Sequence, residues 1–365
     1  MSKIAEPYIL DRHFNTIGVL DAYKSFIWTD RYNEAGDFEI TLPVTPNNLT
    51  LFDEDYYIVR QDSEHVMYVD MIEMESDAEN GSILRVSGHS LEKMLDRRVV
   101  WKQRQVSGNL QNGIQTLLNE NAINPSDSNR RIPGLKFVAS TDKHVTDITV
   151  DTQFTGDSLY EAVVSLCQAA HLGFKITMPA DGAYEFRLYA GVDRTYGQTE
   201  RPYIIFSPYY ENLMNSNSIT SYENHRTVAL VGGEGEGSDR KYETVSEIAG
   251  PGSGLSRREI FIDARDVSSK ITNNDGSTRE LTPAEYSESL KNRGKEKLAE
   301  FLTTTTFDGE AETSRSFEYM KEFNIGDLVQ LETEYQQTFI ARISEYIYSY
   351  DESSANEYPS FKILS

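Results

Sequence analysis

Short segments with the character of β-strands, separated by turn residues, recur through the first 90 residues and constrain the fold most strongly. They are rich in Ile, Val, Tyr and Phe, and their short, even spacing is typical of a barrel or sandwich. Asn80-Gly81 lies between two of them and predicts a hairpin turn, because both residues tolerate positive φ. The segments are 25–28, 37–42, 56–60, 65–71 and 83–87.

Helical periodicity then replaces this pattern. Apolar residues recur at helical spacing over 90–98 and 109–121, and most clearly over 157–171. A hairpin with Asp181-Gly182 at its turn is expected next. We therefore expect residues 99–190 to form a small α+β domain inserted in β structure.

Strand-like segments return after residue 200, at 203–206, 219–222, 227–231 and 259–263. The glycine-rich stretch 232–254 predicts an exposed loop. Pro283 suits the first turn of a helix over 283–302, because proline lacks only a donor that is not needed there. Two long strands are expected over 323–331 and 337–350. The sequence thus predicts a mixed, mainly β fold with an α+β insertion.

The charge balance of the chain excludes some partners. The formal net charge is −23, which opposes nonspecific nucleic-acid binding, since that affinity depends on Lys and Arg. An anionic membrane surface is equally disfavoured, and apolar runs are far below the roughly 20 residues of a spanning helix. Aromatic residues make up 11% of the chain, which favours a folded protein.

The single cysteine, Cys167, excludes an intrachain disulfide. It favours folding in a reducing cytoplasm, and residues 1–13 lack the apolar stretch of a signal peptide. Cys167 and His171 could share a helix face as a thiolate–imidazole pair. The favoured interpretation is a small core side chain, because Cys167 lies on the apolar stripe of the predicted helix.

Other motifs do not indicate catalysis or a cofactor. The run of glycines at 232–237 is interrupted by Glu234 and Glu236, which would repel phosphate, so a hairpin or interface loop is favoured. Residues 273–276 resemble part of a calcium loop, but Ile271 and Thr282 occupy positions that an EF-hand needs for ligands. The sequence contains no HExxH or GxSxG motif. We expect a protein that is not an enzyme and that needs no cofactor or metal.

An ordered set of short motifs resembles the siphophage baseplate hub family, the tail-tip or Tal-type proteins. The first is FIWTDRYNEAGDFEI at 26–40. It is followed by VSGHSL at 86–91 with LDRR at 95–98, GVDRT at 191–195, IFS at 205–207, GEGEG at 233–237, RRE at 257–259 with DARD at 263–266, and NIGDLV at 324–329. Each motif is short, but together they span nearly the whole chain.

The resemblance implies a homotrimer at the distal tail tip of a virion, synthesised in the host cytoplasm. It implies two barrel-like hub domains per subunit, arranged in a pseudo-sixfold ring. This ring would dock on the hexameric distal tail protein, contact the tape measure protein and receptor-binding or other baseplate proteins, and gate DNA release. The expected segments are 1–98 with strands around 200–225, the insertion 99–190, a β-rich part 191–282, a helix 283–304, and strands 305–365 that complete the second barrel.

Many relatives carry a C-terminal hydrolase or receptor binder, whereas this sequence stops at Ser365, soon after its last expected strand. We therefore do not transfer a lytic activity. A wall hydrolase with a hidden carboxylate pair and a glycan-binding module with exposed tyrosines are the alternative functions. Acidic side chains lining an exit channel, or acidity that only maintains solubility, are equally open interpretations of the charge.

A few residues are candidates for structural or interface roles. Asp193 and Arg194 are expected to form a buried or interdomain ion pair or a turn, with a structural role favoured. Asp327 is expected to bind its local backbone in a turn, and Trp28 to lie in a core or interface. The loop 233–237 is a candidate mobile or intersubunit element. Its members are Gly233, Glu234, Gly235, Glu236 and Gly237.

Overall fold

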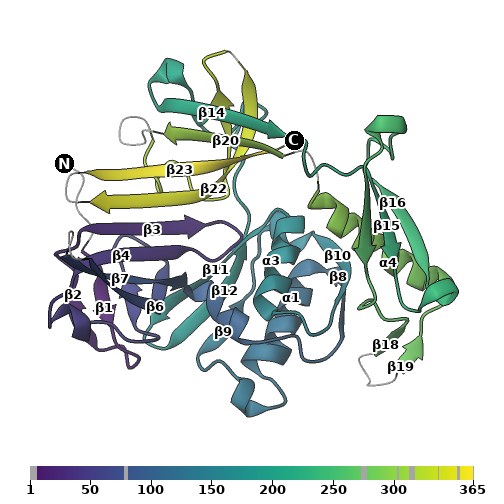
Figure 1. Cartoon of the computed structure of the whole chain (residues 1–365), viewed down its shortest axis with the longest axis horizontal. Coiled ribbons are helices and arrows are strands. Elements are labelled where there is room, and N and C mark those ends of the chain that lie inside the picture. Colours follow the sequence, from purple (N-terminus) through teal and green to yellow (C-terminus); the bar gives the residue numbers. More distant parts are fainter. Residues whose placement is uncertain are drawn as a thin grey trace.

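A computed structural model of the chain describes residues 6–77, 81–272, 278–301, 304–311, 317–335, 337–351 and 354–364. Strands dominate, and an α+β part lies between strand groups from the two ends of the chain (Figure 1). This confirms the mainly β class with an α+β insertion. Asn80 and residues 273–276, where a hairpin turn and a calcium-like loop were considered, lie outside the described residues.

The N-terminal strands and the C-terminal strands belong to one 13-stranded sheet. Its main path runs β14-β20-β23-β22-β3-β4-β7-β6-β5-β1-β2, and β21 pairs with β22 and β13. The N-terminal strands are β1 (Tyr8–Leu10), β2 (Thr16–Val19), β3 (Ser25–Arg31), β4 (Asp37–Pro43), β5 (Tyr57–Val59), β6 (Val66–Asp77) and β7 (Gly81–Ser90). The C-terminal strands are β13 (Ile205–Phe206), β14 (Leu213–Ser221), β20 (Thr304–Ala311), β21 (Leu328–Glu332), β22 (Thr338–Asp351) and β23 (Ala355–Ile363).

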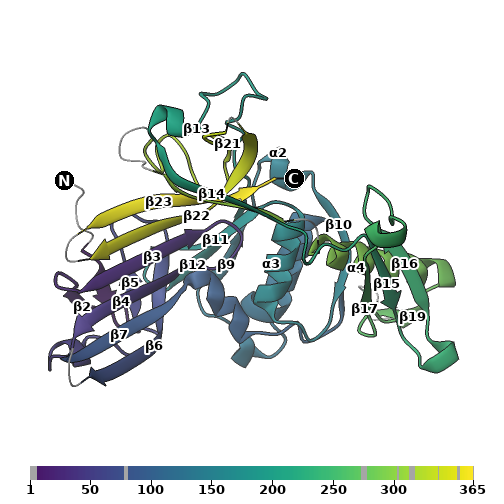
Figure 2. The same ribbon diagram turned by 45° about the horizontal axis from the view of Figure 1, so that its top comes forward.

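The long strand β22 joins the two strand groups (Figure 2). Its first part pairs with β21, and its second part pairs with β3, from Glu345 opposite Arg31 to Asp351 opposite Ser25. A bulge between Ile343 and Glu345 shifts the alternation by one residue, so that Ile343 and Tyr346 are both buried. The extra residue of a bulge reverses which side chains of the strand point to the core.

This pairing does not confirm the two barrel-like domains that the resemblance implies. Among the described residues, β2 and β14 each pair on one side only, so the sheet stays open at both ends. Its core contains side chains from both strand groups, such as Phe26 and Ile58 from the first and Phe206 and Ile343 from the second. Because β22 hydrogen-bonds to both strand groups, they form one continuous sheet.

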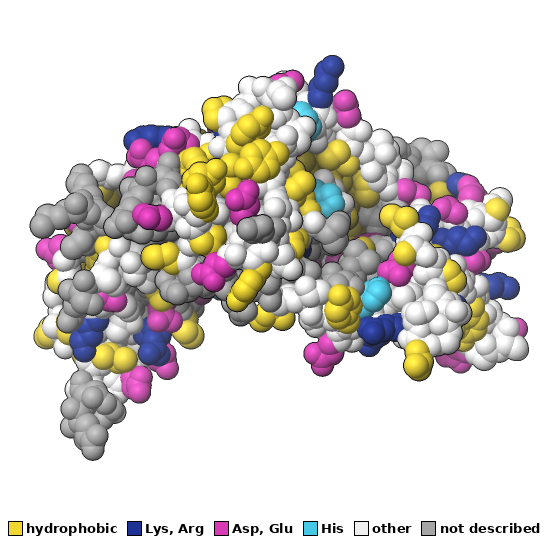
Figure 3. Space-filling view, turned by 90° about the horizontal axis from the view of Figure 1, so that it is seen from above, with side chains coloured by type: hydrophobic (Ala, Val, Ile, Leu, Met, Phe, Trp, Pro, Cys, Tyr) yellow, Lys and Arg dark blue, Asp and Glu magenta, His cyan; other side chains and the backbone are white. Residues whose placement is uncertain are grey.

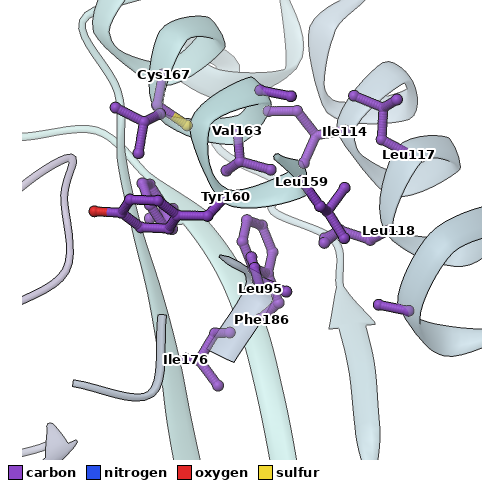
Figure 4. Close-up of a cluster of buried hydrophobic side chains, with 14 of the residues drawn as sticks. Leu95, Ile114, Leu117, Leu118, Leu159, Tyr160, Val163, Cys167, Ile176 and Phe186 are labelled. Carbon is purple, nitrogen blue, oxygen red and sulfur yellow. The ribbon is translucent and has the colours of Figure 1, made fainter. Parts of the chain in front are cut away.

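The inserted part packs two helices against a three-stranded sheet, β11-β12-β9. The helix predicted over 157–171 is confirmed as α3. Side chains of α1 and α3 meet those of β11 and β12 in a buried cluster (Figure 4). The elements are β8 (Arg104–Asn109), α1 (Leu110–Leu118), β9 (Leu135–Val138), α2 (Lys143–Thr146), β10 (Thr149–Phe154), α3 (Leu159–Ala169), β11 (Gly173–Ala180) and β12 (Ala183–Tyr189).

A smaller unit packs one helix on the sheet β16-β15-β17. The helix predicted over 283–302 is confirmed as α4, with Pro283 in its first turn. The predicted loop 232–254 is wrong in part, because it contains β16, whose backbone pairs with β15. The elements are β15 (Val228–Gly232), β16 (Tyr242–Ser246), β17 (Glu259–Asp263), β18 (Lys270–Thr272), β19 (Thr278–Glu280) and α4 (Pro283–Ala299).

Cys167 is fully buried within the α3 cluster, and burial raises the pKa of its thiol. Because the thiolate is the reactive form, we expect native protein to leave Cys167 unmodified by Ellman's reagent. One equivalent should react after unfolding in guanidinium chloride. Fast reaction of the native protein would contradict this and would reopen the thiolate–imidazole interpretation.

Candidate functional site

A cavity of about 280 Å³ lies where the N-terminal strands, the inserted part and the segment before β21 meet. We call it the junction pocket. Charged side chains of both signs line it, and so do two tyrosines. Its lining residues are Asp30, Glu64, His65, Lys175, Tyr189, Ala190, Val192, Tyr319, Met320, Asn324, Ile325 and Asp327.

Trp28 and Asp30 lie on β3 beside this pocket. Trp28 is fully buried, and its indole N–H donates to Asp30 Oδ1 at 2.8 Å. Burial raises the pKa of Asp30 despite the attraction of His65. The Arg60 guanidinium lies 5.4 Å from the Trp28 ring centroid and 3.7 Å from that of Tyr348. Trp28 thus lies in the core, as expected from the sequence, and positions a carboxylate at the pocket.

His65 faces a second buried carboxylate, from Glu92. His65 Nδ1 lies 3.7 Å from Glu92 Oε1, which also accepts the Ile176 N–H at 2.6 Å. Burial alone would lower the pKa of His65, but the charges of Asp30 and Glu92 raise it from 6.5 to about 9. Burial would raise the pKa of Glu92, but His65 and the Ile176 N–H hold it below its usual range. Through the hydrogen bond from the Ile176 N–H, Glu92 joins the N-terminal part to β11.

The His65 ion pair predicts a specific pH dependence of stability. The folded protein holds the His65 proton more tightly than the unfolded chain, so the stabilisation is complete below pH 6.5 and is lost as the pH rises through about 9. The loss should reach about 3 kcal/mol. Urea unfolding between pH 6 and pH 9.5 measures it. His65→Gln should remove most of the slope, and an unchanged slope in that variant would contradict the assignment.

The Asp327 side chain hydrogen-bonds the segment after β12 to the start of β21. It accepts the Val192 N–H and the Arg194 Nε–H, both at 2.8 Å, and the Asn324 N–H at 3.1 Å. Asp327 is 1% exposed. The sequence predicted a local turn role for Asp327 and a pair or turn for Arg194. The structure combines these roles, because Asp327 bonds its own turn and also pairs with Arg194. Asp193 instead accepts the Thr195 N–H in a turn.

Two glycines and one tyrosine complete this junction. Gly326 has φ of +93°, and a Cβ there would lie 2.1 Å from the Tyr32 ring. A Cβ on Gly191 would lie 1.8 Å from the Gly326 carbonyl oxygen. The Tyr32 hydroxyl donates to the His171 carbonyl at 3.0 Å and accepts the Gly191 N–H at 3.1 Å. Only glycine permits such close backbone approach, so three parts of the chain meet around Tyr32.

The glycine-rich loop lies elsewhere, in the unit that contains α4 (Figure 1). Gly233 is buried against α4, where a Cβ would lie 2.4 Å from the Tyr286 hydroxyl. The Glu234 N–H donates to that hydroxyl at 2.7 Å. The remaining candidates Gly235, Glu236 and Gly237 are exposed. The structure therefore brings Trp28, Arg194 and Asp327 near one junction but separates the loop from them.

The junction pocket holds ion pairs and hydrogen bonds, and its described lining contains neither serine nor cysteine. Among the described residues, no group of three or more His, Cys, Asp or Glu side chains could hold a metal ion. None of the described helices is long and apolar enough to cross a membrane. His65 and Glu92 were missed by sequence reasoning, because no local motif marks them.

Three solved structures share this fold over almost the whole chain. The tail protein from Neisseria meningitidis MC58 has a TM-score of 0.57 at 11% identity and covers 99% of this chain and 97% of its own. Prophage tail protein gp18 from Listeria monocytogenes EGD-e has a TM-score of 0.54 at 13% identity, and the match covers 98% of this chain and 94% of that protein. The prophage MuSo2 43 kDa tail protein from Shewanella oneidensis has 0.54 at 13%, with 98% of both chains covered.

These likenesses, at identities of 13% or less, show the fold alone. No curated protein shows a significant sequence match. A family model, in contrast, matches residues 6–359. This match confirms the siphophage resemblance seen in the short motifs. The chain belongs to the siphovirus ReqiPepy6 Gp37-like protein family.

Proposed function

We propose that this protein is a structural, non-enzymatic subunit of the siphophage tail and forms a homotrimeric hub at the distal tip. The observation that carries the proposal is the agreement of family and fold along the chain. The family match spans 6–359, and the fold is that of three tail proteins over at least 98% of this chain. The hub position and the trimer go beyond that agreement and rest on the motif resemblance.

The two strand groups are the proposed barrel-like domains of the hub. Edge strands β2 and β14 each lack a second partner among the described strands. Ile17, Val19 and Ile219 on these edges are between 40% and 49% exposed. An unpaired strand edge favours pairing with another chain. Pairing between subunits at these edges would close the ring that docks on the distal tail protein.

Gating follows from the separate units of the chain. The unit containing α4 has its own core, whereas the inserted part shares a core with the N-terminal strands. The α4 unit can therefore move as a rigid body about a connection. We propose that receptor-binding or other baseplate proteins move one unit against the hub and thereby release the tape measure protein and DNA. Loop 233–237 is proposed as an intersubunit element.

The acidity of the chain supports passage of DNA without adhesion. A trimer would carry a formal charge of −69, three times the −23 of one chain, and a negative channel wall would repel phosphate. In Figure 3, acidic side chains are spread over several parts of the face that is shown. We propose that part of this negative charge lines the channel through which DNA leaves. A predominantly basic channel wall would contradict this.

Localisation in the virion tests the hub proposal. Gold-labelled antibodies against this protein should mark the distal tail tip in negatively stained virions. Label along the tube or at the capsid would contradict the hub position. The non-enzymatic role is tested separately by zymography on host cell walls, where a lysis band from the purified protein would contradict it.

A further inference from the structure

A second cavity, of about 330 Å³, opens between the N-terminal sheet and the inserted part. We call it the arginine pocket. Its wall is mainly apolar and aromatic, with Phe14, Tyr57, Met94 and Ile132 among the lining residues. Arg12, Arg97 and Arg98 also line it, together with a single carboxylate, from Asp55. A concave, mostly apolar site with a few charged groups is the usual form of a ligand site.

The aromatic wall is held in place before any ligand arrives. The Phe14 ring stacks on Tyr57, with centroids 5.2 Å apart and planes at 21°. The Tyr57 hydroxyl lies 2.7 Å from the Tyr184 hydroxyl. Phe14 has φ of +65°, a left-handed conformation that is unfavourable for a bulky side chain. Such strain is found where a residue must present its side chain in one direction.

The three arginines are neutralised to different degrees. Arg97 is paired with Asp55 through two hydrogen bonds, at 3.0 and 2.5 Å. Arg98 donates to the backbone carbonyls of Arg130 and Arg97, and no ion pair of Arg98 with a carboxylate is found among the described residues. Arg12 lies 3.6 Å from carboxylates of Asp53 and Glu54, with its own side chain 48% exposed. Exposed pairs of that kind are weak.

The lining of the pocket therefore holds three arginines and one carboxylate, on a protein whose net charge is −23, and the carboxylates of Asp53 and Glu54 beside Arg12 are exposed and are not part of the lining. We propose that the arginine pocket binds an acidic peptide segment of a partner protein. An apolar or aromatic side chain of that segment packs on Phe14 and Tyr57, and its carboxylates pair with Arg12 and Arg98. This inference goes beyond the proposed hub function and does not depend on it.

The chemistry of the wall favours a peptide over an anionic sugar. Met94, Ile132 and Pro133 line the cavity with apolar side chains. These side chains cannot hydrogen-bond to the hydroxyl groups of a sugar ring. Charge complementarity favours carboxylates, because arginine pairs with them through two parallel hydrogen bonds. An acidic segment with one apolar side chain satisfies both parts of the pocket.

Selection from a random heptapeptide library on the immobilised protein tests the proposal. Peptides that bind the native protein but not the Arg12→Glu variant should be enriched in Asp or Glu next to Phe, Tyr, Leu or Met. The most enriched peptide, labelled with fluorescein, is then titrated by fluorescence anisotropy. Enrichment that lacks acidic residues, or no enrichment over the variant, would overturn the proposal.

Matched variants separate binding from folding. Arg12→Glu and Arg98→Gln should each weaken peptide binding by about tenfold, the effect of losing one charged hydrogen bond. Phe14→Gly should also weaken binding, while glycine accepts the positive φ and preserves the fold. Arg201→Glu is the control, because the Arg201 side chain is also 48% exposed and does not line the pocket. Its affinity for the peptide should equal that of the native protein.

Two further measurements have outcomes that would overturn the proposal. If trigalacturonic acid displaces the labelled peptide at lower concentration than the unlabelled peptide does, the pocket is a glycan site. If Arg12→Glu changes the mass of the protein in solution, the pocket is a contact between copies of this chain. We expect the sugar to compete poorly and the mass to be unchanged.

Discussion

Replacing Asp327 with alanine should lower the free energy of unfolding by about 3–5 kcal/mol, the usual cost of removing one partner from a buried ion pair. The carboxylate accepts hydrogen bonds from Arg194 Nε and from the Val192 and Asn324 N–H groups. Alanine would leave all three donors without this acceptor, and the Arg194 side chain is only 15% exposed. Urea unfolding of native protein and variant measures the difference.

Two variants locate the origin of this loss. Asp327→Asn keeps one acceptor oxygen and should lose less stability than Asp327→Ala. Arg201→Ala removes a long, exposed pair of 4.0 Å with Glu200 and should change stability by less than about 0.5 kcal/mol. Equal, small effects of Asp327→Ala and Arg201→Ala would contradict the fastening role of Asp327.

Trp28→Ala should also cost about 3–5 kcal/mol, the range for truncation of a buried large aromatic residue. Trp28 is fully buried in the core that the two strand groups share. Truncation leaves a cavity and removes the N–H donor from Asp30, which is 2% exposed. Thermal and urea unfolding measure the effect. Circular dichroism monitors the unfolding, because its signal does not depend on either tryptophan being present.

The second tryptophan is the matched control. Trp101 is 68% exposed, and Trp101→Ala should change stability by no more than about 0.5–1 kcal/mol, as is usual at the surface. Trp28→Phe keeps an aromatic ring and removes the N–H, so it should lie between the other two variants. A Trp28→Ala variant as stable as Trp101→Ala would rule out the shared core around Trp28.

The sequence predicted several elements from local patterns. The apolar stripe over 157–171 corresponds to α3, and the Pro283 signal corresponds to α4. Pairing of β22 with β3 could not be predicted, because it joins residues 314 to 326 positions apart and no local signal specifies it. The bulge after Ile343 was missed because apolar residues recur at every second position both before it and after it, as they do in a regular strand.

The candidate site was predicted only where a residue contacts its neighbours in the sequence. Asp327 was assigned to a turn from its place after Gly326. Arg194 was expected to form an ion pair or a turn with Asp193, but its partner is Asp327. Their pairing depends on the return of β21 beside the segment after β12. His65 gave no signal, because its role arises from neighbours that are distant in the sequence.

The mass of the assembled protein tests the central claim, a homotrimeric hub, most directly. Light scattering on the size-exclusion peak of the purified protein, alone and mixed with the distal tail protein of the same phage, should give a species of this chain near 124.5 kDa, three times 41.5 kDa. In the mixture, the excess mass above the distal tail protein ring should equal three chains. A 41.5 kDa monomer in both samples would contradict the hub.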